Sequence, residues 1–227
     1  MTNVSFITIK DLTKTYEDAG KKIIVFDRLN LNLDKNSIIS LVGPSGSGKS
    51  SLLHILAMLD TFDGGSYFFD SKNISSFSLS EKNLNRATKI SIVYQFNNLI
   101  SDLNALENVA LPLLINKEEK SFALQQAEAM MIKVGLEARI KHFPNQLSGG
   151  EQQRVAIARA IITEPELILA DEPTGNLDKN NSLEIFNLLK SLKSKNRLIL
   201  FATHNRELSS MTDIQLEISN SSVKRIE

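Results

Sequence analysis

The sequence has 227 residues, enough for one domain of ordinary size with a substantial core, and it carries 26 basic and 26 acidic side chains. A net charge of zero argues against a general nucleic-acid binder and against a protein that adheres to anionic membranes. No cysteine is present, which excludes disulfides and thiolate metal sites and fits a cytosolic protein.

The apolar segments of the chain give no sign of a membrane anchor. Residues 1–5 lack the basic start and the apolar core of a signal peptide. No apolar run approaches the roughly 18–20 residues that span a bilayer. We therefore expect any membrane-embedded part of the system to lie on another chain.

The first forty residues contain alternating apolar and polar side chains, as strands do. This alternation predicts a strand over 5–11 and two more over 23–26 and 29–33. Tyr16 falls in a polar segment between them, which we interpret as a loop. Its ring could stack on an adenine base or pack on its neighbours, and the residue type alone favours packing.

A glycine-rich run separates an apolar strand-like segment, 38–42, from an apolar helix-like segment, 52–56. The run is Gly43-Pro44-Ser45-Gly46-Ser47-Gly48-Lys49-Ser50. Strand, glycine turn and helix in this order form a phosphate-binding loop, whose backbone N–H groups and helix N-terminus face the phosphates. Lys49 would reach the β- and γ-phosphates, and the Ser50 hydroxyl would hold Mg²⁺. The run predicts nucleotide binding.

The central part of the chain changes from strands to helices. The expected elements are a buried helix over 49–59, a turn over 63–65, a strand over 66–69, a polar segment of loop with some helix over 73–89, and a strand over 90–94. Leucines at helical spacing then predict a helical lobe over 101–145, with a strong helix over 121–134. Phe96, Leu99 and Ile100 begin this lobe, and we interpret them as core residues rather than as an apolar surface for a partner.

The C-terminal part alternates helices and strands. The expected elements are a helix that begins at Ser148 and runs to Ile162, a fully apolar strand over 167–170, an amphipathic helix over 181–193, a buried strand over 198–202, and two short strands within 213–226. This alternation predicts a parallel sheet with its ligand site at the carboxyl edge.

Two acidic residues follow the apolar strand at 167–170. Asp171 matches the acidic residue with which phosphate-loop enzymes hold Mg²⁺. Glu172 could orient or deprotonate the water that attacks a γ-phosphate, or it could cap a turn before Pro173.

A second site for an anion is suggested by Ser148-Gly149-Gly150, which opens a helix with free N–H groups. The same residues also form a plain helix cap, in which Ser148 and Glu151 make a capping box. The two interpretations are compatible.

Taken together, these motifs resemble the nucleotide-binding domain of ABC transporters over nearly the whole chain. The residues that carry the resemblance are Gly43–Ser50, Gln95, Leu147–Gln152, Leu167–Glu172, Asp178 and His204. Within that family, 94–96, 105–109, 112–114 and 171–178 resemble the branch that contains the ATPases of lipoprotein release, macrolide export and cell division, and the first of these is the most similar. Ser51 stands where threonine is common.

The resemblance implies a P-loop NTPase fold of the ABC ATPase type. This α/β fold has a mixed sheet core, an N-terminal antiparallel β subdomain and an inserted α-helical subdomain. The whole chain, 1–227, would form a single ABC ATPase domain. Its core would cover about 1–95 and 160–227, and its helical subdomain about 96–159.

The resemblance also implies a role for each matched residue. Tyr16 would stack on the adenine of ATP, and the loop from Gly43 to Ser51 would bind the phosphates. Ser50, Gln95 and Asp171 would hold Mg²⁺. Glu172, His204 and Gln95 would be catalytic, with Gln95 on the attacking water and His204 touching the γ-phosphate and bracing Glu172.

A second copy of the chain would complete the site. Ser148, Gly149, Gly150 and Glu151 would act on the ATP held by the other subunit, and Asp178 would lie at the dimer seam. Two anion sites that face different ways are both used when two copies meet about a two-fold axis.

The expected function is ATP hydrolysis that powers release of lipoproteins from the inner membrane. The chain would bind integral membrane permease subunits at the cytoplasmic face, and no nucleic acid. The alternatives are a cell-division regulatory ATPase and a macrolide or peptide exporter ATPase of the same branch. A small-molecule kinase or GTPase is a poor match, because 116–119 only approaches the guanine-recognition pattern and follows no buried strand.

Overall fold

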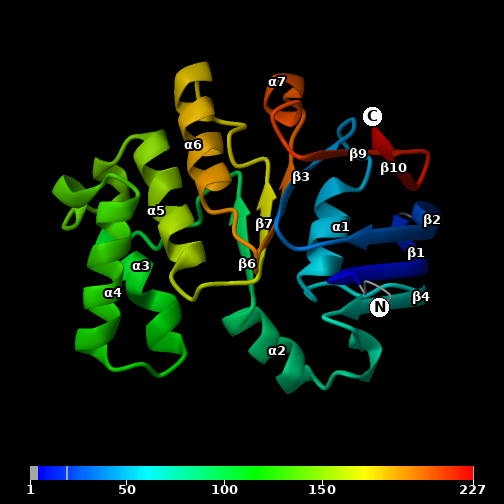
Figure 1. Cartoon of the computed structure of the whole chain (residues 1–227), viewed down its shortest axis with the longest axis horizontal. Coiled ribbons are helices and arrows are strands. Elements are labelled where there is room, and N and C mark those ends of the chain that lie inside the picture. The colour runs from blue at the N-terminus through cyan, green and yellow to red at the C-terminus, as the bar shows by residue number, and fades with distance from the viewer. Residues whose placement is uncertain (1–4, 19, 227) are drawn as a thin grey trace.

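The computed structural model describes residues 5–18 and 20–226, which form two β-sheets and a group of helices (Figure 1). The strands are β1 (Ile7–Asp18), β2 (Lys21–Leu33), β3 (Ser37–Val42), β4 (Gly64–Phe69), β5 (Lys72–Asn73), β6 (Ile90–Tyr94), β7 (Leu167–Asp171), β8 (Leu198–Ala202), β9 (Ile214–Ser219) and β10 (Ser222–Ile226). The α-helices are α1 (Lys49–Leu56), α2 (Leu79–Thr88), α3 (Ala105–Ile115), α4 (Lys120–Lys133), α5 (Gly149–Ile161), α6 (Lys179–Ser191) and α7 (Arg206–Ser209). Short 3₁₀ helices cover Ile74–Ser76, Glu137–Arg139 and Pro144–Gln146.

The larger sheet has the strand order β10-β9-β3-β8-β7-β6. All its pairs are parallel except β10 with β9, which is antiparallel, so the expected parallel sheet is confirmed, with a mixed edge. Strands β7 and β8 are apolar and buried on both faces, which is why they lack a polar period. Because the five strands from β9 to β6 run the same way, their carboxyl ends share one edge.

Alternate residues of the central strands enter two different cores. Ile39, Leu169 and Leu200 pack with helix α1 on one face of the sheet. Ile168 and Ile199 pack with α5 and α6 on the other face, and Figure 1 shows these helices on the opposite side from α1. The period of two in each strand thus produces a three-layer arrangement of helix, sheet and helix.

The smaller sheet is antiparallel, with the order β2-β1-β4-β5. Two expectations were wrong here. Strand β1 continues to Asp18, so Tyr16 lies in a strand and not in a loop, and 23–26 and 29–33 belong to the single strand β2. The β1–β2 pair contains register shifts on both sides of Lys14. Such irregularities interrupt the alternation of side chains that marks a strand.

Helices α3, α4 and α5 form the helical lobe around a third apolar cluster. Leu99 packs against this cluster, but the side chains of Phe96 and Ile100 are 70% and 42% exposed, so their assignment to the core was wrong. Helix α5 contributes Val155 and Ala158 to the lobe and Ile157 and Ile161 to the central core. The subdomain limits at 95/96 and 159/160 remain a prediction.

The segment 73–89 is more regular than expected. It contains the ten-residue helix α2, which begins after Ser78 with a capping box formed by Ser78 and Glu81. The helix buries no residue and most of its side chains are polar, so the sequence shows no clear apolar period by which the helix could be predicted. Within the described parts of the chain, no helix is long and apolar enough to cross a membrane.

Candidate active site

A cleft of about 450 Å³ opens at the carboxyl edge of the larger sheet. Its walls combine the glycine-rich loop, the ends of β6 and β7, and part of the smaller sheet. The lining residues are Tyr16, Ile23, Val25, Ser45, Gly46, Gly48, Lys49, Ser50, Ser51, Gln95, Asp171 and Glu172. The fold thus brings ten of the expected site residues into one cleft, whereas Gly43, Pro44 and Ser47 do not line it.

The glycine-rich loop connects β3 to α1, and its backbone requires glycine at Gly48. This residue has φ of 101°, and a Cβ atom there would lie 2.7 Å from Val25 Cγ1. Helix α1 begins directly after it without a side-chain cap. The N–H groups of the first turn are therefore free to bind an anion, and the helix dipole favours one there.

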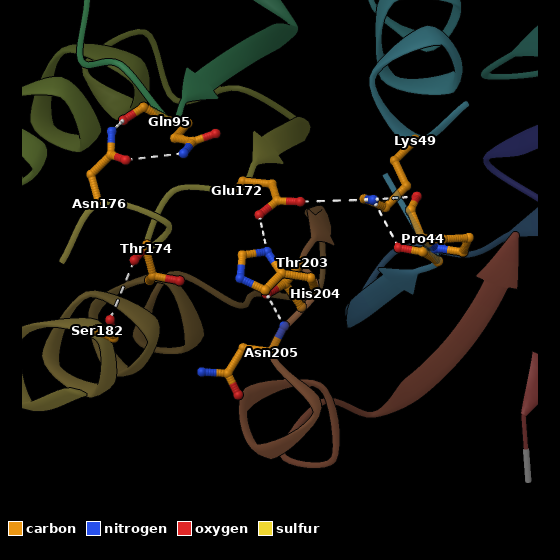
Figure 2. A network of polar contacts seen from close by, with 11 residues as sticks. Pro44, Lys49, Gln95, Glu172, Thr174, Asn176, Ser182, Thr203, His204 and Asn205 are labelled. Carbon is orange, nitrogen blue, oxygen red and sulfur yellow. Dashed lines mark hydrogen bonds and ion pairs between the residues drawn. The ribbon is translucent and has the colours of Figure 1, made fainter. Parts of the chain in front are cut away.

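Lys49 has a buried side chain that is held against the loop itself (Figure 2). Its ammonium group donates to the carbonyl oxygens of Gly43 at 2.9 Å and Pro44 at 3.1 Å. It also lies 3.7 Å from Glu172 Oε1. This position places one positive charge between the phosphate loop and the acidic end of β7.

Glu172 follows β7 in a left-handed conformation with φ of 47°. Its N–H donates to the carbonyl of Ala202 at 3.0 Å, which fixes the residue against the end of β8. A non-glycine residue in this conformation is strained, and such strain concentrates at functional positions. The expected turn after it is present, because the N–H of Gly175 donates to the Glu172 carbonyl at 2.9 Å, whereas a role for Glu172 at the attacking water stays a prediction.

His204 lies two residues beyond β8 and meets Glu172 through its ring, as Figure 2 shows. Its Nδ1 atom contacts Glu172 Oε2, so the imidazole fixes the orientation of the carboxylate. The His204 side chain is largely exposed and does not line the cleft. The chain thus brings Lys49, Glu172 and His204 into one row of contacts across the carboxyl edge.

Three residues at the cleft offer oxygen ligands of the kind that Mg²⁺ prefers: the Ser50 hydroxyl, the Asp171 carboxylate and the Gln95 amide. Asp171 ends β7 and lies opposite Tyr94 of β6 in the sheet register. Among residues 5–18 and 20–226, no group of three or more His, Cys, Asp or Glu side chains could hold a metal alone. The set fits a Mg²⁺ ion, because Mg²⁺ is usually bound by one or two carboxylates together with substrate phosphates.

Gln95 is held by a residue that the sequence did not single out. Its Nε2 group donates to Asn176 Oδ1 at 3.1 Å, which links the end of β6 to the segment after Glu172 (Figure 2). Ile23 and Val25 were also missed as site residues, and they give the cleft apolar walls beside Tyr16. Pattern analysis treats such residues as ordinary strand positions, because only the tertiary fold brings them to the loop.

The Ser148 run lies outside this cleft. Ser148 caps α5 in the expected capping box, since its hydroxyl accepts from the Glu151 N–H at 3.3 Å and its own N–H donates to Glu151 at 2.8 Å. That N–H, and then Arg139 at 2.7 Å, lower the pKa of Glu151. The Glu151 charge is therefore paired within the subunit, and of the two glycines that begin the helix, Gly149 is exposed and Gly150 is buried.

Asp178 caps the next helix, α6. It accepts hydrogen bonds from the N–H groups of Asn180 and Asn181, both at 3.0 Å. These bonds, with that of the Asn181 N–H first, lower its pKa. Asp178 also lies outside the cleft, so the Ser148 run and Asp178 lie at the starts of α5 and α6, apart from the residues that line the cleft.

Comparisons with known proteins agree with this arrangement. A family model described as "ABC transporter" matches residues 26–175. The lipoprotein-releasing system ATP-binding protein LolD of Wigglesworthia glossinidia brevipalpis is 42% identical over 97% of this chain and 96% of its own. An uncharacterized ABC transporter ATP-binding protein of Methanocaldococcus jannaschii is 41% identical over 89% and 91%. A solved dimeric structure of the ATP-binding cassette MJ0796, in a post-hydrolysis state bound to ADP and phosphate, has a TM-score of 0.88 and 36% identity over 97% of both chains.

Proposed function

The chain belongs to the ABC transporter family, and from that premise we propose that it is the ATP-binding and ATP-hydrolysing subunit of a complex that releases lipoproteins from a membrane. The observation that carries the proposal is the cleft in which Lys49, Asp171 and Glu172 meet at the end of the sheet. It combines a site for phosphate with carboxylates for metal and water, as hydrolysis of a phosphoanhydride requires.

Binding of ATP would use the uncapped start of α1 and the ammonium group of Lys49. In the described conformation Lys49 donates to two carbonyls of its own loop, and phosphate oxygens would take over these bonds. The exchange is favourable because phosphate is charged and the carbonyls are not. Ser50, Asp171 and Gln95 would hold Mg²⁺, which when bound would neutralise charge on the phosphates.

Hydrolysis would use Glu172 to orient and deprotonate the attacking water. Its carboxylate is held by the His204 ring on one side and lies near Lys49 on the other, so the base is fixed before the substrate arrives. Gln95 would reach the same water and metal once it leaves Asn176. These roles are chemistry that the side chains can perform at the places they occupy.

A second copy of the chain would supply the missing side of the site. Helix α5 begins with exposed Gly149 and buried Gly150 outside the cleft, and the resembling cassette MJ0796 is dimeric with ADP and phosphate. Two copies related by a two-fold axis would place the Ser148 run of each over the ATP of the other. The dimer is then the unit that hydrolyses ATP.

Permease subunits would bind a surface formed by α2 and α3. A groove of about 340 Å³ runs between α2, β6, α3 and α5. Ile115 lines it and is 67% exposed, and Leu84 of α2 is also exposed. Exposed apolar side chains gathered on one region mark an interaction surface, and a cytoplasmic segment of a permease subunit is the partner that family membership favours.

Release of lipoproteins is favoured by the similarity to LolD proteins of several bacteria. The archaeal relative of nearly equal identity carries no cargo in its name, so overall identity alone does not select the cargo. A cell-division regulatory role or macrolide export would use the same ATPase site with a different membrane partner.

The test is to purify the chain together with its membrane partner and to measure ATP hydrolysis in lipid vesicles. We expect a permease-like partner, and hydrolysis that rises when a lipoprotein is added and is lost in Lys49→Met. A matched sample would contain a macrolide or a lipid-free form of the lipoprotein. A complex stimulated only by the macrolide, or one assembled with division proteins, would contradict lipoprotein release but not ATP hydrolysis.

A further inference from the structure

Tyr16, at the edge of the cleft, is held by two other side chains. Its hydroxyl donates a hydrogen bond to Asp60 Oδ2 at 2.6 Å. The Lys14 ammonium group lies over the Tyr16 ring, 4.5 Å from its centre. One face of the ring is therefore covered by a cation, and Tyr16 is 38% exposed and lines the cleft.

Lys14 and Asp60 form a pair that is itself fixed. Lys14 is only 5% exposed, and its ammonium group donates to Asp60 Oδ1 at 2.9 Å and to the Thr61 carbonyl at 2.8 Å. Burial alone would raise the pKa of Asp60, but the bonds from Tyr16 and Lys14 outweigh it and lower the pKa. The carboxylate is thus charged at neutral pH and binds both neighbours at once.

The backbone next to this pair is also tied to strand β1. The Thr15 N–H donates to Asp63 Oδ2 at 2.6 Å, and the Asp63 N–H donates to the Thr13 carbonyl at 2.8 Å. These bonds fasten the segment 60–63 along β1 on the N-terminal side of Tyr16. The ring cannot turn away from the cleft without breaking contacts to this segment.

Helix α1 joins the same segment to the phosphate loop. The helix starts at Lys49, and the Asp60 N–H donates to the carbonyl of His54 within it, at 3.2 Å. One short helix therefore has the phosphate-binding lysine at its start and the anchor of the Tyr16 ring just beyond its end. Helix α1 and the segment that follows it thus connect the phosphate site to the anchor of the ring.

We propose that Asp60 and Lys14 are positioning residues that hold the Tyr16 ring as a platform for a flat nucleobase at a set distance from the phosphate loop. The proposal rests on the proposed function, because it assigns the base-binding end of the same nucleotide site. Neither residue touches the nucleotide; both act through Tyr16. The chemical class recognised is the purine ring of ATP, stacked on the face of Tyr16 that Lys14 leaves open.

The size of the effect follows from the freedom that the anchor removes. A tyrosine side chain that must be ordered upon binding reduces affinity by about three- to tenfold. We expect Asp60→Asn to raise the dissociation constant for ATP by this factor, because the amide no longer holds the hydroxyl and the ammonium group together. The maximal rate of hydrolysis at saturating ATP should not change, since no group at the phosphates is altered.

The experiment measures binding of two probes, Mg-ATP and Mg-tripolyphosphate, by calorimetry with the full-length chain. Tripolyphosphate has the phosphates and no base, so its affinity should be the same in the wild type, Asp60→Asn and Tyr16→Phe. Tyr16→Phe keeps the ring, removes only the hydroxyl and leaves the buried Lys14–Asp60 pair intact. This variant therefore tests the anchor even if Asp60→Asn fails to fold. Asp102→Asn, an exposed carboxylate beside Ser101, is the matched control and should bind both probes normally.

The double variant decides whether Asp60 acts through Tyr16. In the Tyr16→Phe background, Asp60→Asn should change ATP affinity by less than about twofold, because the bond it would break is already absent. Equal losses for ATP and tripolyphosphate, or full additivity in the double variant, would overturn the proposal and leave Asp60 a residue of the fold. If the wild type bound neither probe, the proposed function would fail too, whereas normal ATP binding by Asp60→Asn would overturn the positioning role alone.

Discussion

Replacing Glu172 by glutamine is expected to stop hydrolysis and preserve ATP binding. Glutamine keeps the shape of the side chain and an oxygen that can face His204, but it cannot take a proton from water. Removal of a general base lowers turnover by about 10²–10⁴-fold, or about 3–5 kcal/mol of barrier. The variant should therefore bind ATP, dimerise and release almost no phosphate.

The effect on binding can be estimated from the contact with Lys49. At 3.7 Å, with an effective dielectric constant of about 20, the gross attraction between the two charges is about 4 kcal/mol, much of it cancelled by desolvation. In the variant, Lys49 keeps its bonds to the Gly43 and Pro44 carbonyls, so the ammonium group is not left without partners. The phosphates then meet one negative charge fewer, and ATP should bind as tightly as in the wild type or more tightly.

The assay is phosphate release at saturating Mg-ATP, together with light scattering to detect an ATP-dependent dimer. The control is Glu166→Gln, at the other end of β7, where the carboxylate pairs with Lys35 and Lys89. That variant should unfold at a lower temperature and retain turnover. Near-normal turnover in Glu172→Gln would refute the assignment of the base.

Three further expectations concern the loop, the helical lobe and pH. Gly48→Ala should abolish ATP binding and destabilise the chain by at least about 1–2 kcal/mol, because φ is 101° and the new Cβ would lie 2.7 Å from Val25. The control is Gly46→Ala, where φ is 77° and a Cβ would meet nothing within 4 Å. It should lose less stability and less ATP affinity in the same thermal and binding assays. Asn108→Ala should cost about 1–3 kcal/mol, because this buried amide bonds four backbone groups, and hydrogen exchange should show the lobe opening before the central sheet. Burial alone would raise the pKa of Glu166, but its lysine partners lower this pKa below the ordinary value of 4.5. The contribution of Glu166 to the stability of the fold should therefore be complete above pH 4.5 and lost as the pH falls through the lowered pKa. Melting temperatures measured from pH 7 into the acid range should be constant at first and then fall.

The elements that could be predicted are those whose sequence pattern is local. Strands β7 and β8 are short, mainly apolar runs; β7 ends at Asp171, which lines the cleft, and β8 ends two residues before His204. The phosphate loop is equally local, because Gly48 and Lys49 act within a few residues of each other. In these segments, the residues that determine the local structure also provide the functional groups or lie directly beside them.

The parts that could not be predicted depend on contacts between distant residues. Tyr16 was expected in a loop because the register shifts of β1 remove its alternation, and its anchor at Asp60 is 44 residues away. Phe96 was expected in the core because it is apolar, although it stays exposed. Helix α2 has mostly polar side chains and buries no residue, and only the Ser78–Glu81 capping box could have indicated its start.

The position of β3 in the larger sheet has a consequence for how the protein is synthesised. Its two neighbours are β8 and β9, so the strand that leads into the phosphate loop finds no partner until residues 198–219 have been made. The small antiparallel sheet and the helices of the lobe contain only shorter-range pairs and can form earlier on the ribosome. A nascent chain that stops before β8 has every residue of the phosphate loop, but the strand that leads into the loop, β3, has neither of its neighbours in the sheet. The phosphate loop, whose sequence is translated early, is therefore among the last parts of the molecule to be assembled.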